Sequence, residues 1–222
     1  MDFEQWIGFL FDRPTEGDQK WYEALSDEPN IAAEQALDFM TRTFRSCGVT
    51  LKNFSDDQIA LGIDYLMNPA ISDFVRLVNS KSLDLDKRAA CLETLTFLYD
   101  DCFAARCIYE AGNITPSGLN GVCYRLWDRS GLAHLAGSLG KKKRGSGDVG
   151  QRGEAVHNVF RSALRSQNLA CVQSALHGLA HAHRHAPPFV EAIIDDFLNL
   201  GRTDLPSEII TYANQARRGL PT

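Results

Sequence analysis

Apolar side chains recur at helical intervals along the chain, and this pattern is clearest between residues 168 and 200. A helix advances about 100° per residue, so side chains three and four positions apart share a face. One face here carries large side chains and another carries small ones. The large ones are Leu169, Val172, Leu176, Leu179 and His183, and the small ones are Cys171, Ala175, Gly178 and Ala182. The pattern predicts a helix from Leu169 to about His185 that packs on both sides.

A second helix is predicted directly after the first. The sequence Ala186-Pro187-Pro188 indicates a turn, because proline interrupts a continuing helix. Apolar residues then resume at helical spacing as Phe189, Ile193, Phe197 and Leu200. Two helices joined by a short turn form an αα-hairpin, the unit that is stacked in α-solenoids.

The remaining sequence also predicts helices. They cover approximately residues 3–11, 21–25, 30–47, 55–67, 71–78, 84–112, 117–139 with a break near Ser130-Gly131, 156–164 and 206–216. Ser55 and Gln58 have the spacing of a capping box at one helix start. No segment alternates with a period of two for long enough to predict a strand. We therefore predict an all-α fold, an α-α superhelix of HEAT- or armadillo-like stacked hairpins, because the helices are too numerous for one four-helix bundle.

The composition changes between residues 140 and 153. Four basic residues in a row, Lys141, Lys142, Lys143 and Arg144, are followed by glycines at positions 145, 147, 150 and 153. Such a segment offers little apolar surface to offset the entropy lost on ordering. We expect a flexible loop at about 140–153, within a single helical-repeat domain that covers residues 1–222.

Composition and charge narrow the functional classes. The 222 residues carry a formal net charge of -5, which gives no electrostatic reason to expect nucleic acid as the main partner. The acidic residues Asp2 and Glu4 make the amino terminus unlike a signal peptide. No apolar run approaches the roughly 20 residues that span a bilayer. We expect a cytoplasmic protein that does not bind membranes.

The six cysteines lie within apolar helical patterns and form no C-x-x-C pair. Cysteine is often simply a small core residue. The sequence therefore predicts buried free thiols rather than disulfides.

His177 and His181 lie one helical turn apart, which is a spacing that can bind a metal. Gly178 replaces the glutamate of an H-E-x-x-H motif, so the general base of a zinc protease is absent. A carboxylate from the next helix completes a metal site in one interpretation, and the candidates are Glu191, Asp195 and Asp196, with Asp195 as the main one. In the simpler interpretation, the two histidines form hydrogen bonds across a helix interface and bind no metal.

The sequence from Gly145 to Gly150 matches G-x-G-x-x-G, but no strand precedes it, so a dinucleotide site is not predicted. The basic run Lys141, Lys142, Lys143 and Arg144 before a helix start suits an anion such as phosphate. A solvated loop is the simpler interpretation.

Several segments give the chain a resemblance to a known family. They are residues 9–14 (FLFDRP), 123–128 (CYRLWD), 171–181 (CVQSALHGLAH), 194–198 (IDDFL) and 212–219 (YANQARRG). With these segments the chain resembles an uncharacterised family of bacterial helical proteins that look like HEAT-repeat proteins. The resemblance implies the helical-repeat fold and carries no known activity.

No catalytic signature is present, so the main expectation is a non-enzymatic scaffold that binds another protein and needs no cofactor. The alternatives are a metal-dependent enzyme that uses His177 and His181, and binding of an anion or nucleic acid by the loop from Lys141 to Arg144. The identity of the partner and the oligomeric state stay open.

Overall fold

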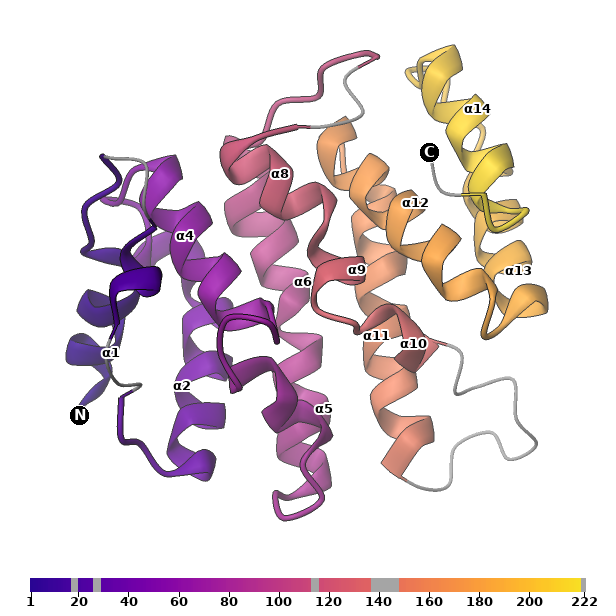
Figure 1. Cartoon of the computed structure of the whole chain (residues 1–222). Coiled ribbons are helices and arrows are strands. Elements are labelled where there is room, and N and C mark those ends of the chain that lie inside the picture. The colour runs from indigo at the N-terminus through magenta and orange to yellow at the C-terminus, as the bar shows by residue number, and fades with distance from the viewer. Residues whose placement is uncertain (17–19, 26–28, 113–115, 137–147, 221–222) are drawn as a thin grey trace.

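The computed structural model describes residues 1–16, 20–25, 29–112, 116–136 and 148–220, and all regular secondary structure in these residues is helical (Figure 1). The longer helices are α1 (Phe3–Phe11), α2 (Ala33–Arg45), α4 (Asp56–Met67), α5 (Leu85–Glu93), α8 (Gly118–Tyr124), α11 (Asp148–Arg165), α12 (Leu169–His183), α13 (Pro187–Leu198) and α14 (Ser207–Ala216). The shorter ones are η1 (Trp21–Ala24), α3 (Cys47–Thr50), η2 (Phe74–Asn79), α6 (Leu95–Phe97), η3 (Leu98–Phe103), α7 (Ala104–Arg106), α9 (Leu126–Arg129) and α10 (Ala133–Ala136). Within the described ranges, no helix is long and apolar enough to cross a bilayer. The prediction of an all-α chain is confirmed.

The longer helices form two rows that run from the amino-terminal end of the molecule to the carboxyl-terminal end (Figure 1). One row contains α1, α4, α8, α12 and α14, and each of these helices contacts the next. The other row contains α2, α5, α11 and α13, which also contact one another in that order. Helices that follow each other in the sequence therefore alternate between the rows. Helix α12 also contacts α9, α10, α11 and α13, so it lies near the centre of the carboxyl-terminal half.

The predicted hairpin at residues 169–200 is present. The side chain of Asn168 caps α12 by accepting a hydrogen bond from the Ala170 amide at 2.8 Å, and its Nδ2 donates to the carbonyl oxygens of Ala104 and Cys107. Pro187 and Pro188, which the sequence placed in the turn, instead form the first turn of α13. Proline is tolerated there because the first amides of a helix have no partner within the helix.

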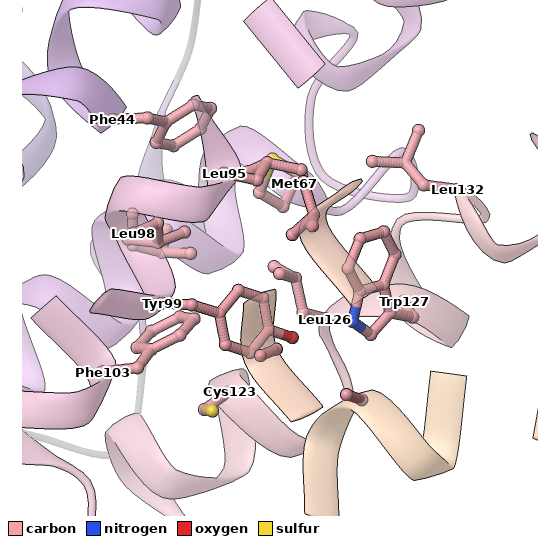
Figure 2. Packing of buried hydrophobic residues seen from close by; sticks show 14 of the residues in the cluster. Phe44, Met67, Leu95, Leu98, Tyr99, Phe103, Cys123, Leu126, Trp127 and Leu132 are labelled. Atoms are coloured by element: carbon pink, nitrogen blue, oxygen red, sulfur yellow. The ribbon is translucent and has the colours of Figure 1, made fainter. Parts of the chain in front are cut away.

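A continuous apolar core extends from Trp6 in α1 to Ala216 in α14. Figure 2 shows its middle part, where Tyr99 of η3 lies near Leu126 and Trp127 of α9. The rings of Tyr99 and Trp127 are stacked with 6.2 Å between their centroids, and both side chains are fully buried. The Tyr99 hydroxyl forms a 2.6 Å hydrogen bond with Ser174 of α12. These contacts hold the short helix α9 against α12.

The small-residue face of α12 allows close packing, as its sequence predicts. A Cβ atom at Gly178 would lie 2.5 Å from the ring of Trp127. Such a distance is well inside van der Waals contact, so the indole occupies the space that any larger residue needs. The glycine therefore sets how closely α9 approaches α12.

The predicted loop at 140–153 is wrong in its second part, because α11 already begins at Asp148. The cause is a set of ionic contacts that the local sequence does not indicate. Asp148 accepts hydrogen bonds from Arg88, which comes from α5, and from Arg152 one turn further along α11. Arg152 is buried and donates to the Val78 carbonyl oxygen at 3.1 Å. Residues 140–147 lie outside the described residues.

The long helix predicted toward Gly112 is also interrupted. It contains the π-helical segment η3 and ends at Arg106, where the Arg106 guanidinium donates to the carbonyl oxygens of Leu51 and Lys52. The cysteine prediction, in contrast, is confirmed, since all six thiols are buried and free. Burial raises the pKa of Cys47 and Cys91 to about 12, so these thiols stay protonated at neutral pH.

Candidate functional site

Two histidines of α12 lie side by side where the helix crosses α9. The rings of His177 and His181 meet edge to face, with 4.8 Å between their centroids. His177 is 7% exposed, whereas His181 is only partly buried. The predicted proximity of the two imidazoles on one flank of the helix is therefore present.

Asp128, at the end of α9, supplies a carboxylate to the same place. Its Oδ1 lies 3.8 Å from Nε2 of His177, and its side chain is 29% exposed. This oxygen is itself buried and forms no hydrogen bond within the part of the chain that the structure describes. One ligand atom from each of Asp128, His177 and His181 can be chosen so that all three lie within 4.8 Å of one another. We call these three residues the Asp–His–His cluster.

Two tyrosines hold the buried histidine from the opposite side. Nδ1 of His177 is hydrogen-bonded to the hydroxyl of Tyr212 on α14 at 2.8 Å. That hydroxyl is in turn 3.1 Å from the hydroxyl of Tyr124 on α8, whose ring lies against the imidazole with 4.2 Å between centroids. The ring contacts with Tyr124 and His181 and the hydrogen bond at Nδ1 restrict the orientation of the His177 ring, and its Nε2 lies 3.8 Å from Oδ1 of Asp128.

The surroundings keep His177 uncharged at neutral pH. Burial lowers its pKa from 6.5 to about 4, while the nearby carboxylate of Asp128 acts in the opposite direction. His181 and Arg125 add to the lowering because a positive charge nearby disfavours a second one. A neutral imidazole with a fixed ring is the form that donates a nitrogen lone pair to a metal.

The carboxylate expected from α13 is engaged elsewhere. Asp195 accepts hydrogen bonds from Arg217, the residue after α14, at 2.7 Å and 3.0 Å. Glu191, the acid one turn earlier, lies 3.6 Å from Nε2 of His183, which is not in the cluster. Asp195 and Glu191 of α13 thus have other partners, and α9 supplies the carboxylate near His177.

Sequence reasoning did not find Asp128. The residue belongs to a short helix far from α12 in the sequence, and nothing in its neighbours marks it as a ligand. Trp127 precedes Asp128, and Gly178 follows His177. The packing of Trp127 against Gly178 therefore brings Asp128 close to His177. The contact between Trp127 and Gly178 joins two helices that are distant in the sequence, so no local pattern predicts it.

The second predicted site is the basic run that precedes α11. Lys141, Lys142, Lys143 and Arg144 lie outside the described residues, so anion binding by this segment stays a prediction. Of the glycine-rich motif that follows, Asp148 to Gly150 form the start of α11.

A groove of about 510 Å³ lies between α2 and α5 on the other row of helices. It is lined by Ala32, Glu34, Gln35, Leu37, Asp38 and Thr41 from α2 and its start, and by Lys87 and Ala90 from α5. Lys87 and Glu34 form an ion pair between the two helices, which raises the pKa of Lys87. We call this surface the α2–α5 groove.

No protein-family model, curated protein or solved structure matches the chain. The resemblance to a HEAT-like bacterial family therefore stays a prediction.

Proposed function

We propose that the chain is an α-α superhelix of stacked helical hairpins, and that it acts as a non-enzymatic scaffold that binds a protein partner in the α2–α5 groove. The observation that carries the proposal is the alternation of consecutive helices between two rows over the length of the molecule. Stacked hairpins of this kind present long surfaces for recognition without needing a reactive side chain.

The lining of the groove supports a protein as its occupant. Ala32 and Ala90 offer apolar contact, while Glu34, Asp38 and Lys87 provide charges. Surfaces that bind proteins typically combine apolar and polar side chains in this way. The groove has two acids and one base, so we expect the partner to place a basic residue near Asp38.

A photocrosslinking experiment tests the proposal. A photoreactive amino acid replaces Ala32 at the edge of the groove, and the control carries it at Thr211, which is exposed on α14 in the other row. After irradiation in the cells that produce the protein, adducts are identified by mass spectrometry. The proposal expects a discrete protein adduct from position 32 that position 211 does not give.

A charge reversal then tests whether the groove selects that partner. Asp38→Lys should reduce the adduct from position 32 by at least about tenfold, because like charges at an interface cost several kcal/mol and each 1.4 kcal/mol or so is a factor of about ten. Glu208→Lys makes the same charge change on α14 and should leave the adduct intact. The same set of adducts from both crosslinking positions, or an adduct indifferent to Asp38→Lys, would count against the groove as the binding surface.

A further inference from the structure

We propose that Asp128, His177 and His181 bind a divalent transition-metal ion of the zinc class. The proposal concerns a site on the opposite row from the α2–α5 groove and does not depend on the proposed function. The identity of the ligand atoms and their geometry support it.

The spacing of the ligand atoms fits a small ion. Ligand atoms around a tetrahedral ion with bonds of about 2.0–2.2 Å lie about 3.4 Å apart. His177 and Asp128 are already 3.8 Å apart, and no pair in the cluster exceeds 4.8 Å. His181 and Asp128 are both partly exposed, so small rotations of their side chains close the remaining distance.

The polar atoms of the cluster have an unmet requirement that a cation meets. The buried Oδ1 of Asp128 makes no hydrogen bond in the described chain, although buried carboxylate oxygens are almost always paired. At 3.8 Å it is too far from Nε2 of His177 for a direct hydrogen bond. An ion between these two atoms satisfies both of them.

The contact at Nδ1 of His177 completes the chemistry. When Nδ1–H donates to the Tyr212 hydroxyl, Nε2 keeps its lone pair and faces the cluster. Histidine ligands in metal sites nearly always donate their second ring N–H to an oxygen in this way. In this tautomer Tyr212 is a positioning residue that orients the imidazole ring.

The class of metal follows from the donor set. Two imidazoles and one carboxylate suit zinc, iron, nickel or copper, whereas calcium and magnesium prefer sites made only of oxygen ligands. Three protein ligands leave one position of a tetrahedral ion for water or another ligand. The nearby Arg125, the residue before α9, is a charge that opposes a cation, and its side chain is exposed to solvent.

The test uses the full chain purified without an affinity tag. Elemental analysis should find about one equivalent of a first-row transition metal, and adding Zn²⁺ to chelator-treated protein should raise the Tm by about 5 °C or more. Cobalt(II) should give the absorption of a tetrahedral site with nitrogen and oxygen ligands. Less than a tenth of an equivalent as purified, with neither the Tm shift nor the cobalt spectrum, would overturn the proposal.

Variants locate the ion. His181→Gln and Asp128→Asn should each weaken zinc binding by at least about tenfold, and Tyr212→Phe should weaken it by about 10–100-fold. His183→Gln, two residues further along α12, is the matched control and should bind zinc like the wild type. If His181→Gln is folded by circular dichroism and binds zinc unchanged, the ion lies elsewhere and the assignment is wrong. Binding of only magnesium or calcium also contradicts it.

Discussion

Asp64, which contacts α9, and Asp128, which belongs to α9, differ in their hydrogen bonding. Asp64 of α4 accepts hydrogen bonds from the hydroxyl of Tyr22 and from the guanidinium of Arg129, both at 2.7 Å, and Lys20 lies 3.3 Å away. Asp128 precedes Arg129 in the sequence, yet its Oδ1 has no hydrogen bond in the described structure. The protein thus provides hydrogen-bond partners for the carboxylate of Asp64, whereas Oδ1 of Asp128 has none among the described residues.

The difference separates a structural network from a candidate site. Burial alone would raise the pKa of Asp64, but the hydrogen bonds from Tyr22 and Arg129 outweigh it and hold the pKa below its ordinary value. A buried polar network with every member paired stabilises one arrangement of the chain. A network with a member left unpaired is stable only at some cost, and this cost is removed when a ligand binds. The first kind should therefore matter for folding and the second for binding.

The largest expected effect on the free energy of unfolding comes from removing the carboxylate of Asp64. Asp64→Ala leaves the Tyr22 hydroxyl and the Arg129 guanidinium without their shared acceptor, in a position that is 95% buried. Removing one partner of such a network costs about 3 kcal/mol, somewhat less than a fully buried pair because Arg129 and Lys20 are partly exposed. Urea unfolding at pH 7 measures this loss directly.

Replacing Asp128 should affect stability far less than replacing Asp64. Asp128→Asn keeps the size of the side chain, and its Oδ1 has no hydrogen bond to lose in the described residues. The substitution should change the free energy of unfolding of the metal-free protein by about 0.5 kcal/mol or less. A loss close to that of Asp64→Ala would mean that Asp128 is a structural residue.

A second substitution acts on the contact that brings the cluster together. Gly178→Ala places a Cβ 2.5 Å from the ring of Trp127, so α9 has to move away from α12. Overpacking of this kind costs about 1–3 kcal/mol, and the movement should also separate Asp128 from His177 and weaken zinc binding. Thermal unfolding and zinc titration of the same variant measure both effects.

The control for this substitution is another helical glycine. A Cβ atom at Gly8 in α1 meets no atom within 4 Å, so Gly8→Ala should stabilise the protein by about 0.5–1 kcal/mol. Equal effects of the two substitutions would show that the contact between Trp127 and Gly178 does not limit the packing of α12.

A third buried group allows a test by pH. His157 is 1% exposed, its ring is stacked on Phe189 with 3.4 Å between centroids, and its Nε2 has no hydrogen bond in the described structure. Burial, helped by the charge of Arg161, lowers its pKa from 6.5 to about 3, although a contact with the Ala136 backbone opposes the shift. The folded chain therefore holds a neutral imidazole well below pH 6.5.

The sign of the pH dependence follows from this shift. Between pH 6.5 and about 3 the unfolded chain binds a proton at His157 that the folded chain does not bind, so stability falls as the pH is lowered. The slope from this residue is about 1 kcal/mol per pH unit. Urea unfolding at pH 7, 6 and 5 should show a smaller decrease for His157→Gln than for the wild type. His134→Gln, at an exposed histidine, should keep the slope of the wild type.

The sequence predicts the helices well where local chemistry determines them. Ser55 and Gln58 form the expected capping box, with side-chain to backbone hydrogen bonds of 3.2 Å and 3.0 Å. The apolar periodicity of α12 and α13 gives the hairpin, because each side chain's position on a helix depends only on its spacing. The local sequence does not indicate the helical start at Asp148, because its partner Arg88 comes from another helix.

The candidate site was predicted in part for the same reason. His177 and His181 belong to one helix, so their proximity follows from the four-residue spacing. Asp128 and Tyr212 come from α9 and α14, and their positions depend on which helices pack on α12. Asp195 was a reasonable candidate because α13 follows α12 in the chain, but the guanidinium of Arg217 is its partner.

The smallest effect is expected from a substitution of Asp195, the carboxylate predicted from α13. Asp195 and Arg217 have side chains that are 45% and 39% exposed, and ion pairs in contact with water contribute little to stability. Asp195→Asn should therefore change the Tm by about 1 °C or less and leave the zinc affinity of the protein unchanged. Calorimetric titration of this variant beside Asp128→Asn compares the two carboxylates under one condition. If Asp195→Asn were the variant that loses zinc, the ion would lie between α12 and α13, and the carboxylate of α9 would have no part in binding it.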